Sequence, residues 1–288
     1  MTDTLPLPPR EMLFEPARVV LPANWAGHVP FAAWLMARHA PERLVELGTH
    51  TGFSYAAFCQ AVVEYDLPTQ CYSVDTWGGD EHAGHYGDQV FAELQAYHDP
   101  KYGHFSRLLR MTFDDALDYF QEGSIDLLHI DGLHTYEAVR HDYDTWRPKL
   151  SSRGIVLFHD INVRERGFGV WKLWEELSAQ YPHIAFSHSH GLGVLLVGDD
   201  IPPAVRALAE AYQRHPAQVR QAFGLSGQRI ELLAQIQEWK AFHAALDHEI
   251  EKRDRMLEER QTEIQALLDS HSWRITQPLR RLAGWLRR

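Results

Sequence analysis

The sequence predicts an α/β fold, with a doubly wound, mostly parallel sheet that ends in an antiparallel hairpin and is followed by a long C-terminal helix. Short runs rich in Val, Ile and Leu alternate with amphipathic stretches from residue 19 to residue 198. Near the end of this region, only a short glycine-containing stretch with Gly191 and Gly193 separates two apolar runs, which indicates a hairpin. Beyond Gly227 the apolar residues recur at alternating spacings of four and three, which is typical of a coiled coil.

Six apolar runs are expected to form strands, and six amphipathic stretches are expected to form helices. The expected strands cover residues 44–47, 71–75, 125–131, 154–160, 184–188 and 194–197. The expected helices cover residues 31–38, 54–64, 90–97, 114–120, 135–146 and 169–180. Strands that alternate with helices in this way predict βαβ units, and hence a mostly parallel sheet.

Changes in pattern divide the chain into five parts. These are a lead segment at 1–23, the α/β domain at 24–200, a helical connector at 201–226, a coiled-coil helix at 227–270 and a basic tail at 271–288. The connector is opened by Pro202 and Pro203, which suit the start of a helix.

Composition excludes several classes of protein. The 288 residues carry a formal charge of −11, from 28 Lys and Arg against 39 Asp and Glu, which argues against nucleic acid as a partner. Cys59 and Cys71 lie in apolar segments and are expected to be free thiols, as in a reducing compartment. The N-terminus lacks the apolar region of a signal peptide, and no run approaches the roughly 20 apolar residues that span a bilayer. We therefore expect a soluble, cytoplasmic protein.

The segment after Gly227 carries the coiled-coil pattern. Its apolar positions are Leu232, Ile236, Trp239, Leu246, Ile250, Leu257, Ile264 and Leu267. The same register places His243, Arg253 and Arg260 on the seam, which weakens the pattern. The segment predicts a helix that makes the protein a homo-oligomer. The alternative is one long helix that folds back on the domain.

The last sixteen residues contain five arginines and no acid, and Trp273 and Trp285 accompany an apolar stripe. A basic amphipathic helix of this kind can lie in an anionic membrane surface, here the inner face of the membrane, or dock on a protein partner. A solvated helix end that simply follows the coiled coil is the alternative.

A glycine turn after the first expected strand predicts a ligand site. Gly48 and Gly52 allow the backbone to approach a ligand, and the helix that begins near Ser54 presents free N–H groups to an anion. The dinucleotide fingerprint would need glycine at two positions that are His50 and Phe53 here, so that class is excluded. A P-loop is excluded as well, because no Gly-Lys-Ser/Thr follows.

Two carboxylates indicate which ligand suits this turn. Glu46 lies two residues before Gly48, where it would attract a cation while the helix N-terminus attracts a carboxylate. An amino acid zwitterion satisfies both, and S-adenosylmethionine (SAM) carries one. Asp75 ends the next expected strand, the position at which an acidic side chain binds ribose hydroxyls in doubly wound folds. The alternative is a tight turn that binds no ligand.

Two further strand ends carry Asp131 with His134, and His159 with Asp160. Carboxyl ends of parallel strands meet at the ligand-binding edge of such a sheet. Two carboxylates there suit a divalent metal such as Mg²⁺, held by Asp131 and Asp160, with His134 as general base. The alternatives are that both carboxylates cap turns and that His159 is a core histidine.

The segment 77–102 is rich in Gly, His, Asp and Tyr and reads as a loop. Trp77, His82 and Tyr86 are the expected acceptor-binding residues of this loop, together with His159 from the sheet edge. Aromatic rings can stack on a sugar face while histidines bind its hydroxyls. An ordinary irregular loop packed over the domain is the alternative.

Four ordered motifs, at residues 45–55, 74–80, 125–136 and 154–160, resemble those of class I SAM-dependent methyltransferases, specifically the methyltransferase-24 family. The resemblance implies a Rossmann-like fold with a SAM site lined by Glu46, Gly48 and Gly52, with Asp75 on the ribose. The wider cofactor-binding set that we predict is completed by Thr49, Ser54, Phe113 and Asp114. Phe113 and Asp114 would lie at the adenine; Asp114 as the N-cap of the following helix is the alternative. The commonest class I pattern has a third glycine where this chain has His50.

The resemblance implies methyl transfer from SAM to a hydroxyl, and the metal site is similar to that of metal-dependent sugar and catechol O-methyltransferases. Residues 272–280 are similar to tails on bacterial surface-glycan transferases, which favours a sugar or polysaccharide acceptor and attachment to a glycan-assembly complex. Two other functions remain open at this point. One is a non-catalytic coiled-coil scaffold, and the other is a metal-dependent hydroxylase on the same fold.

Overall fold

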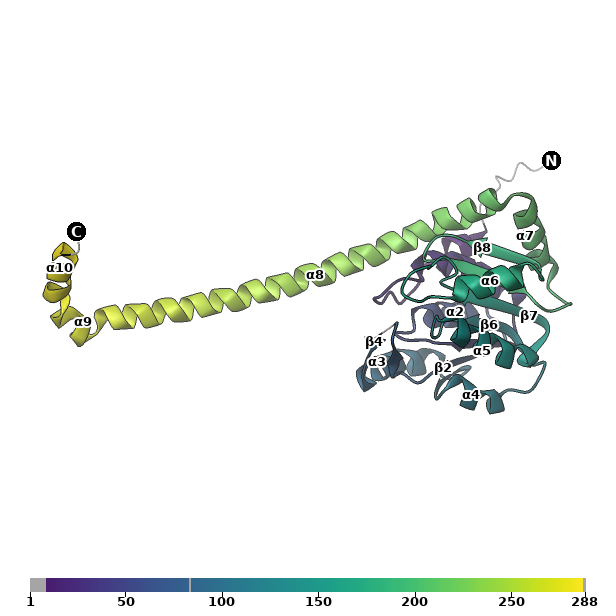
Figure 1. Cartoon of the computed structure of the whole chain (residues 1–288), viewed down its shortest axis with the longest axis horizontal. Coiled ribbons are helices and arrows are strands. Elements are labelled where there is room, and N and C mark those ends of the chain that lie inside the picture. The colour runs from purple at the N-terminus through teal and green to yellow at the C-terminus, as the bar shows by residue number, and fades with distance from the viewer. Residues whose placement is uncertain (1–8, 83, 287–288) are drawn as a thin grey trace. The chain divides into compact units, whose positions relative to one another are not determined.

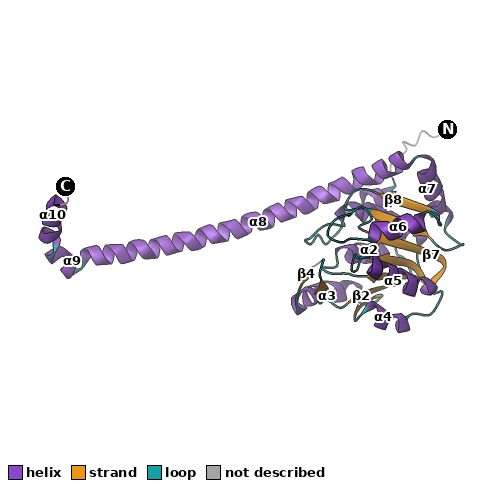
Figure 2. Cartoon of the chain, viewed as in Figure 1, coloured by secondary structure: helices purple, strands orange, loops and turns teal. Residues whose placement is uncertain are grey.

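The computed structural model describes residues 9–82 and 84–286. Seven strands form one sheet in the order β5-β2-β1-β6-β7-β9-β8. Their bounds are β1 Arg43–Leu47, β2 Gln70–Asp75, β5 Ser106–Arg110, β6 Ile125–Ile130, β7 Leu150–His159, β8 His183–Phe186 and β9 Leu192–Leu196. The first five strands in this order run parallel, and β9 is antiparallel to both β7 and β8. Figure 2 shows the strands in orange among the helices of the domain. The predicted fold class, including the closing hairpin, is confirmed.

Helices precede, connect and follow these strands. They are α1 Val29–His39, α2 Phe53–Glu64, α3 Asp88–Tyr102, α4 Phe113–Ala116, α5 Tyr136–Trp146, α6 Val170–Ser178 and α7 Pro203–Arg214. The 3-10 turns are η1 Arg10–Leu13, η2 Ala26–His28, η3 Leu117–Tyr119 and η4 Arg147–Lys149, and β3 Gly79–Asp80 pairs with β4 Gly84–His85. Each helix expected from the sequence of this domain has a counterpart, although the expected helix at 114–120 is split into α4 and η3.

The strand β5 was not expected from the sequence. Only two of its residues, Leu108 and Leu109, are apolar, and they lie between Arg107 and Arg110. Among the strands of the sheet it pairs only with β2, so it forms an edge of the sheet. Charged side chains are tolerated, and even favoured, on an edge strand. For this reason its sequence lacks the continuous apolar run of its buried neighbours.

Helices cover both faces of the sheet, and adjacent residues of a strand pack against opposite layers. Leu44 belongs to a buried cluster that includes residues of α1, α2 and α7, whereas Val45 belongs to a second cluster that includes residues of α4, α5 and α6. Figure 1 shows α5 and α6 together on one side of the sheet. Because both faces are covered, the central strands read as nearly continuous apolar runs.

The long helix α8 Pro216–Asp269 is followed by α9 His271–Ile275 and α10 Gln277–Leu286. The chain divides into two compact units, with the boundary between Gln235 and Ile236. Ile230 and Ala234 of α8 are buried within the first unit, whereas the sequence pattern placed the start of the coiled-coil helix at residue 227.

In the second unit, apolar side chains of the predicted seam are exposed. They are Ile236, Trp239, Leu246, Ile250, Leu257, Ile264 and Leu267. The structure confirms the long helix. The pairing of its exposed seam with a second copy of the chain stays a prediction. Within the described residues, no helix is both long and apolar enough to cross a membrane. Residues 1–8 of the predicted lead segment and 287–288 of the predicted tail lie outside the described residues.

Candidate active site

The predicted site residues come from loops at the carboxyl ends of β1, β2, β6 and β7. In the sheet, β1 lies between β2 and β6, so the chain leaves β1 towards one side and later returns to the other. Such a switch in strand order opens a crevice at the carboxyl edge, where doubly wound folds bind ligands.

The turn after β1 depends on its two glycines. Gly48 has a φ of 84°, and a Cβ atom there would lie 2.2 Å from the carbonyl oxygen of Asp131. Gly52 has a φ of 78° and precedes α2; a Cβ atom there would lie 2.4 Å from the Leu94 side chain. Gly48 therefore lets the turn lie directly against the loop that follows β6, and Gly52 lets it lie against Leu94 of α3.

His50 occupies the place of the third glycine and adopts a left-handed φ of 49°. This conformation is uncommon for a residue with a side chain. Two neighbours hold it: the Trp77 indole N–H donates to the His50 carbonyl at 2.9 Å, and the Tyr86 ring lies 4.7 Å from the imidazole. These contacts hold His50 in a backbone conformation that glycine would adopt more readily.

Asp75 connects the ends of β1 and β2. Its Oδ2 accepts the backbone N–H groups of Thr49 at 2.8 Å and His50 at 2.9 Å, and its Oδ1 accepts that of Trp77 at 2.7 Å. The Thr49 and Ser73 hydroxyls are also bonded to each other at 2.6 Å. The carboxylate that we expected at a ribose thus also orders the glycine turn.

A cavity of about 450 Å³, here called the Asp75 cavity, lies beside this turn. Predicted cofactor residues that line it are Gly48, Thr49, Asp75 and Phe113, joined by Tyr86 from the predicted acceptor loop. Gly132 permits the Phe113 ring to come close, because a Cβ atom at residue 132 would lie 2.5 Å from it. Gly52 lies at the N-cap of α2 and is not among the residues that line this cavity.

Asp114 is turned away from the Asp75 cavity. Its carboxylate is exposed and contacts His141 at 2.8 Å. The N-cap of α4 is Thr112, whose hydroxyl accepts the Asp115 N–H, so the alternative role of Asp114 as the cap is wrong as well. The predicted adenine contact is therefore left to Phe113.

Glu46 is corrected by the structure. Its side chain has no exposed surface, and its Oε2 contacts His129 Nδ1 at 2.8 Å on the adjacent strand β6. It is not among the described residues that line either cavity at this edge. Burial of a charged group requires such a partner. Glu46 thus lies behind the cavity wall, and Oε1 has no partner within the described chain.

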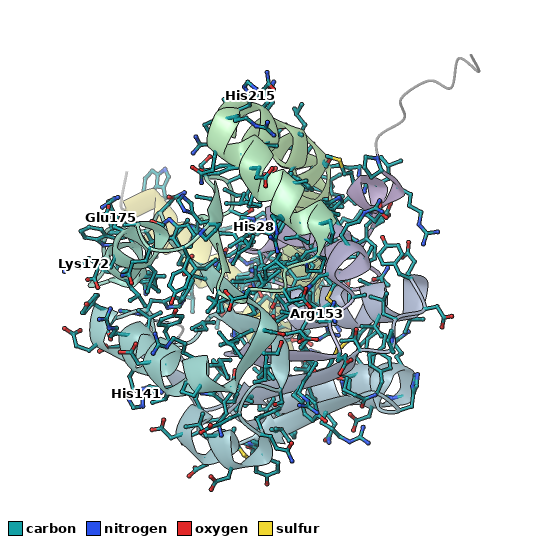
Figure 3. The ribbon with its side chains drawn as sticks, turned by 90° about the vertical axis from the view of Figure 1, so that its right-hand side faces the viewer. His28, His141, Arg153, Lys172, Glu175 and His215 are labelled. Atoms are coloured by element: carbon teal, nitrogen blue, oxygen red, sulfur yellow. The ribbon has the colours of Figure 1, made fainter. Side chains whose placement is uncertain are left out.

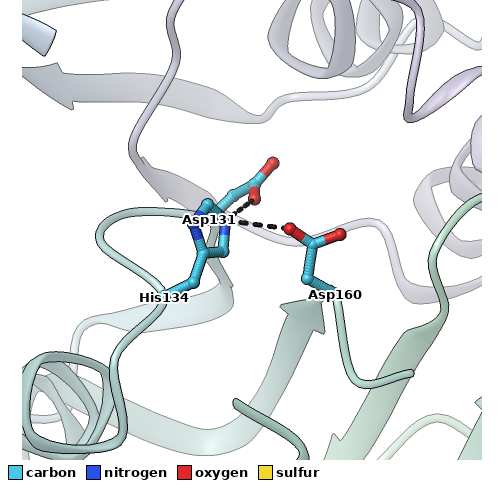
Figure 4. A group of neighbouring side chains, drawn as sticks. All are labelled: Asp131, His134 and Asp160. Carbon is cyan, nitrogen blue, oxygen red and sulfur yellow. Dashed lines mark hydrogen bonds and ion pairs between the residues drawn. The ribbon is translucent and has the colours of Figure 1, made fainter. Parts of the chain in front are cut away.

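Asp131, His134 and Asp160 form a carboxylate–histidine cluster (Figure 4). His134 Nε2 lies 3.4 Å from Asp131 Oδ1 and 3.0 Å from Asp160 Oδ2. His159 Nδ1 lies 3.2 Å from Asp131 Oδ1 and 3.4 Å from Asp160 Oδ1. Asp160 directly follows β7 and has a left-handed φ of 62°, a strained conformation of the kind that occurs at functional sites.

The carboxylates and imidazoles of this cluster change one another's protonation. Burial disfavours charged His134, but its hydrogen bonds to Asp131 and Asp160 outweigh this and raise its pKa to about 10. Burial likewise opposes charge on His159, and the same two carboxylates raise its pKa to about 9. Burial would raise the pKa of Asp131, but the neighbouring His159 and His134 hold it well below its usual value. His134 and His159 are therefore both in the positively charged form, with both ring nitrogens protonated, at neutral pH in this state.

The cluster could also hold a metal ion. One ligand atom each from Asp131, His134 and Asp160 can be chosen so that all lie within 4.8 Å of one another. Carboxylate oxygens suit Mg²⁺ or Mn²⁺, and an imidazole suits Mn²⁺ and other transition metals. The donor set therefore fits a divalent cation.

A second cavity of about 270 Å³, here called the Asp160 cavity, includes this cluster. His82 lines it, with its ring stacked 4.5 Å from Phe168, as does Ser54 at the start of α2. The prediction for Trp77 is wrong: this side chain has no exposed surface, because it packs under the loop and donates to the His50 carbonyl.

Several residues that line the Asp160 cavity were missed by the sequence analysis. Asn24 and Trp25 come from the segment before α1, and Arg166 and Phe168 from the loop after β7. Asn24, Arg166 and Phe168 also line an adjoining cavity of about 570 Å³, together with Asp160. None of them belongs to a motif of regular spacing, so the sequence offers no signal for them beyond an aromatic ring in a polar loop.

Comparison with known proteins agrees with this arrangement. A family model described as a methyltransferase domain matches residues 45–161. The α/β domain is a methyltransferase domain. The match covers the turn after β1, Asp75 and the carboxylate–histidine cluster. It confirms the class I methyltransferase that the four sequence motifs indicated.

One curated protein sequence and several solved structures are similar to this chain. An uncharacterized protein of Sinorhizobium fredii, y4gI, is 53% identical over 185 residues, which are 64% of this chain and 20% of that protein. The chain thus spans about a fifth of the length of this relative. The SAH-bound Podospora anserina methyltransferase PaMTH1 is 14% identical, with a TM-score of 0.45 over 59% of this chain and 77% of that chain. The O-methyltransferase TomG from Streptomyces achromogenes, solved with SAM, is 12% identical, with a TM-score of 0.46 over 63% and 83%.

Proposed function

We propose that the methyltransferase domain transfers a methyl group from SAM to a hydroxyl group, with a sugar or surface polysaccharide as acceptor. One observation carries this proposal: the Asp75 cavity and the Asp160 cavity share Thr49, His50, Asp131 and His134 as lining residues. A nucleoside bound in the first cavity would therefore end beside the carboxylate–histidine cluster in the second. Methyl transfer needs this adjacency of donor and acceptor.

The cofactor would bind along the glycine turn. Asp75 would accept a ribose hydroxyl at the one lone-pair site, on Oδ1, that its three backbone bonds leave free. Phe113 would contact the adenine, and the methionine part would extend past Thr49 towards Ser54. The proposal assigns Glu46 no contact with the cofactor, because its side chain is fully buried against His129.

The acceptor would lie in the Asp160 cavity. Its hydroxyl oxygen attacks the methyl carbon, the carbon–sulfur bond breaks, and S-adenosylhomocysteine (SAH) leaves as a neutral thioether. The hydroxyl proton passes to Nε2 of His134, so this nitrogen must first be unprotonated. With a pKa of about 10 it is protonated at neutral pH while both carboxylates face it.

We assign Asp131 and Asp160 as the residues that hold a divalent cation, Mg²⁺ in the simplest case. Mg²⁺ is usually held by one or two carboxylates and keeps several waters. Held by these two carboxylates, a cation would lower the pKa of the acceptor hydroxyl and would offset the negative charge that keeps His134 protonated. Asp131 also orients the His134 imidazole, from which it lies 3.4 Å.

The sugar acceptor is supported by the lining of its cavity. Phe168 offers a ring on which a sugar could lie, and His82 and Asn24 offer hydrogen bonds to hydroxyls. The similarity of residues 272–280 to tails of surface-glycan transferases points to the same acceptor class. In this proposal the exposed apolar seam of α8 pairs copies of the chain, and the basic tail contacts a membrane surface or a glycan-assembly complex.

Calorimetry of the full chain with SAH tests the cofactor, because product binding needs no acceptor. We expect a dissociation constant in the micromolar range, and the absence of binding at millimolar SAH would overturn the proposal. SAH release is then measured from SAM with a panel of hexoses, nucleotide-activated sugars and catechols. His134→Ala should keep SAH affinity and lose transfer, while transfer at the wild-type rate would remove His134 as the base.

A further inference from the structure

The carbonyl of Ser189, in the loop between β8 and β9, lies next to the carboxylate–histidine cluster. It accepts the Nε2–H of His159 at 3.0 Å and the Nε2–H of His28 at 3.1 Å. Because a carbonyl oxygen can only accept, the proton on each of these Nε2 atoms is fixed. The Nδ1 of His159 is therefore the atom turned towards Asp131 and Asp160.

The segment that provides this carbonyl is strained. Ser189 has a φ of 46° and the following His190 a φ of 66°, both in the left-handed region. Residues other than glycine persist in this region only where surrounding contacts hold them. The contacts that hold Ser189 therefore also decide where its carbonyl, and with it the His159 ring, is placed.

The holding contacts come from two distant segments. The Gly27 N–H donates to Ser189 Oγ at 3.0 Å, and the Ser189 hydroxyl in turn donates to Glu231 Oε1 at 2.5 Å. Glu231 belongs to α8, within the first compact unit of the chain. The hydroxyl thus has one fixed donor and one fixed acceptor, which leaves it little rotational freedom.

Two glycines make this approach of α8 possible. A Cβ atom at Gly27 would lie 2.4 Å from Ser189 Oγ and 2.6 Å from Glu231 Oε1. A Cβ atom at Gly227, one turn before Glu231, would lie 2.1 Å from the Gly27 carbonyl oxygen. The contact between α8 and the segment at Gly27 therefore requires glycine at both residue 27 and residue 227.

His28, the second ring on the Ser189 carbonyl, lies in the interior of the domain, whereas His141, Lys172 and His215 lie at its rim (Figure 3). Its side chain has no exposed surface, and its ring lies 5.7 Å from that of His159. Two buried imidazoles, those of His28 and His159, therefore contact the Ser189 carbonyl from the core.

We propose that Glu231 is a positioning residue of the active site: through the Ser189 hydroxyl it fixes the turn whose carbonyl orients His159 towards Asp131 and Asp160. The inference rests on the proposed function, because it assigns a second histidine to the same cluster. Neither Ser189 nor Glu231 is among the residues that line the Asp75 cavity or the Asp160 cavity, so neither would touch SAM or the acceptor. Their effect is transmitted by orientation alone.

The deciding measurement is hydrogen exchange of the His159 ring N–H in the full chain labelled with ¹⁵N-histidine. The wild type should show a protected downfield N–H resonance that is missing in His159→Gln, which assigns it. Glu231→Ala should exchange this proton at least tenfold faster, and Ser189→Ala should do the same. Glu231→Gln retains an acceptor oxygen for the hydroxyl and should stay within threefold of the wild type.

A second readout is calorimetric titration with Mn²⁺. Loss of a group that orients a metal ligand typically costs 10- to 100-fold in metal affinity. His159 is such a group for Asp131 and Asp160, and Glu231 acts on it through Ser189, so Glu231→Ala should lose Mn²⁺ affinity by up to this range while its affinity for SAH is unchanged. Glu238→Ala removes an exposed carboxylate from the same helix and should match the wild type in both titrations.

These outcomes separate the inference from the proposed function. Wild-type exchange rates in both Glu231→Ala and Ser189→Ala would overturn the inference, whatever the cofactor results. A wild-type protein that does not bind SAH would overturn the proposed function, while the exchange data would still decide the role of Glu231. If Glu231→Ala fails to fold, Ser189→Ala and Glu231→Gln give the answer, since neither alters the packing of α8 against Gly27. A double variant that exchanges no faster than either single variant would indicate that both residues act through one contact.

Discussion

Replacing Asp75 with Asn separates two roles of one side chain. The carboxylate accepts three backbone N–H groups, two from the glycine turn and one from Trp77, and it also lines the Asp75 cavity. Asn keeps the size of the side chain, removes the charge and replaces one oxygen by a donor. The variant should therefore weaken both the folded turn and the binding of a ribose.

The size of each effect follows from these bonds. A hydrogen bond to a charged acceptor contributes about 1 kcal/mol more than one to a neutral acceptor, so the bonds to Thr49 and His50 together lose about 2 kcal/mol. The amide nitrogen cannot accept the Trp77 N–H, which costs about 1 kcal/mol more. A loss of about 3 kcal/mol should lower Tm by about 6 to 12 °C in a domain of this size. The weakened bond to a ribose hydroxyl should reduce SAH affinity about 10-fold.

Calorimetry with SAH and thermal unfolding measure the two roles on the same sample, and Ser73→Ala is the matched control. The Ser73 hydroxyl is bonded to that of Thr49 in the same turn, but Ser73 is fully buried and is not among the residues that line the Asp75 cavity. This variant should lose about 1 kcal/mol of stability and keep SAH affinity within threefold. Wild-type SAH affinity in Asp75→Asn would refute the ribose contact. An equal loss of affinity in Ser73→Ala would mean that order in the turn, and not contact with Asp75, governs binding.

Three other changes test separate features of the chain. Burial raises the pKa of Asp142 to about 7. Between about pH 4 and pH 7 the folded state therefore keeps a proton on Asp142 that the unfolded state has lost, so the free energy of unfolding falls as the pH rises through this range. Asp142→Asn should therefore be more stable than the wild type at pH 8, by at most about 4 kcal/mol in urea unfolding, and the difference should be nearly absent at pH 4; an equal difference at both pH values would contradict this. Ile250→Glu places a charge on the exposed seam of α8 and should reduce the mass found by light scattering to that of one 33.2 kDa chain, whereas an unchanged mass would exclude this seam as the interface. Removal of divalent ions with EDTA should abolish methyl transfer and leave SAH binding intact, and transfer at the full rate after exhaustive dialysis would eliminate the metal from the proposal.

The parts of the site that could be predicted are those that follow directly from the sheet. Asp75, Asp131 and Asp160 each stand at the end of an apolar run, and the carboxyl ends of parallel strands lie at one edge. His134 follows Asp131 closely enough that the two must lie near each other. No knowledge of strand order was needed to bring these residues together, since each of their strands belongs to the parallel part of the sheet.

Glu46 shows where this reasoning stops. It stands within the apolar run of β1, so its side chain must either face a ligand or be paired inside the core. The partner that decides the matter is His129, which is 83 residues away and directly opposite Glu46 in the register of β1 with β6. Neither the neighbour of β1 nor the register can be read from a single sequence. The carboxylate was therefore assigned to the cavity when it belongs behind it.

The prediction for the loop residue Trp77 was wrong for a different reason: the polar composition of a loop does not determine which of its side chains are buried. Trp77 lies in a segment rich in glycine and histidine, yet it is buried, and its indole N–H secures the strained His50. Ser189 and Glu231 lie outside every sequence motif, and only the folded backbone brings them to His159. A motif thus predicts the groups that meet a ligand at the strand ends. The groups that orient them come from chain segments whose approach depends on tertiary packing, here on two glycines that admit α8.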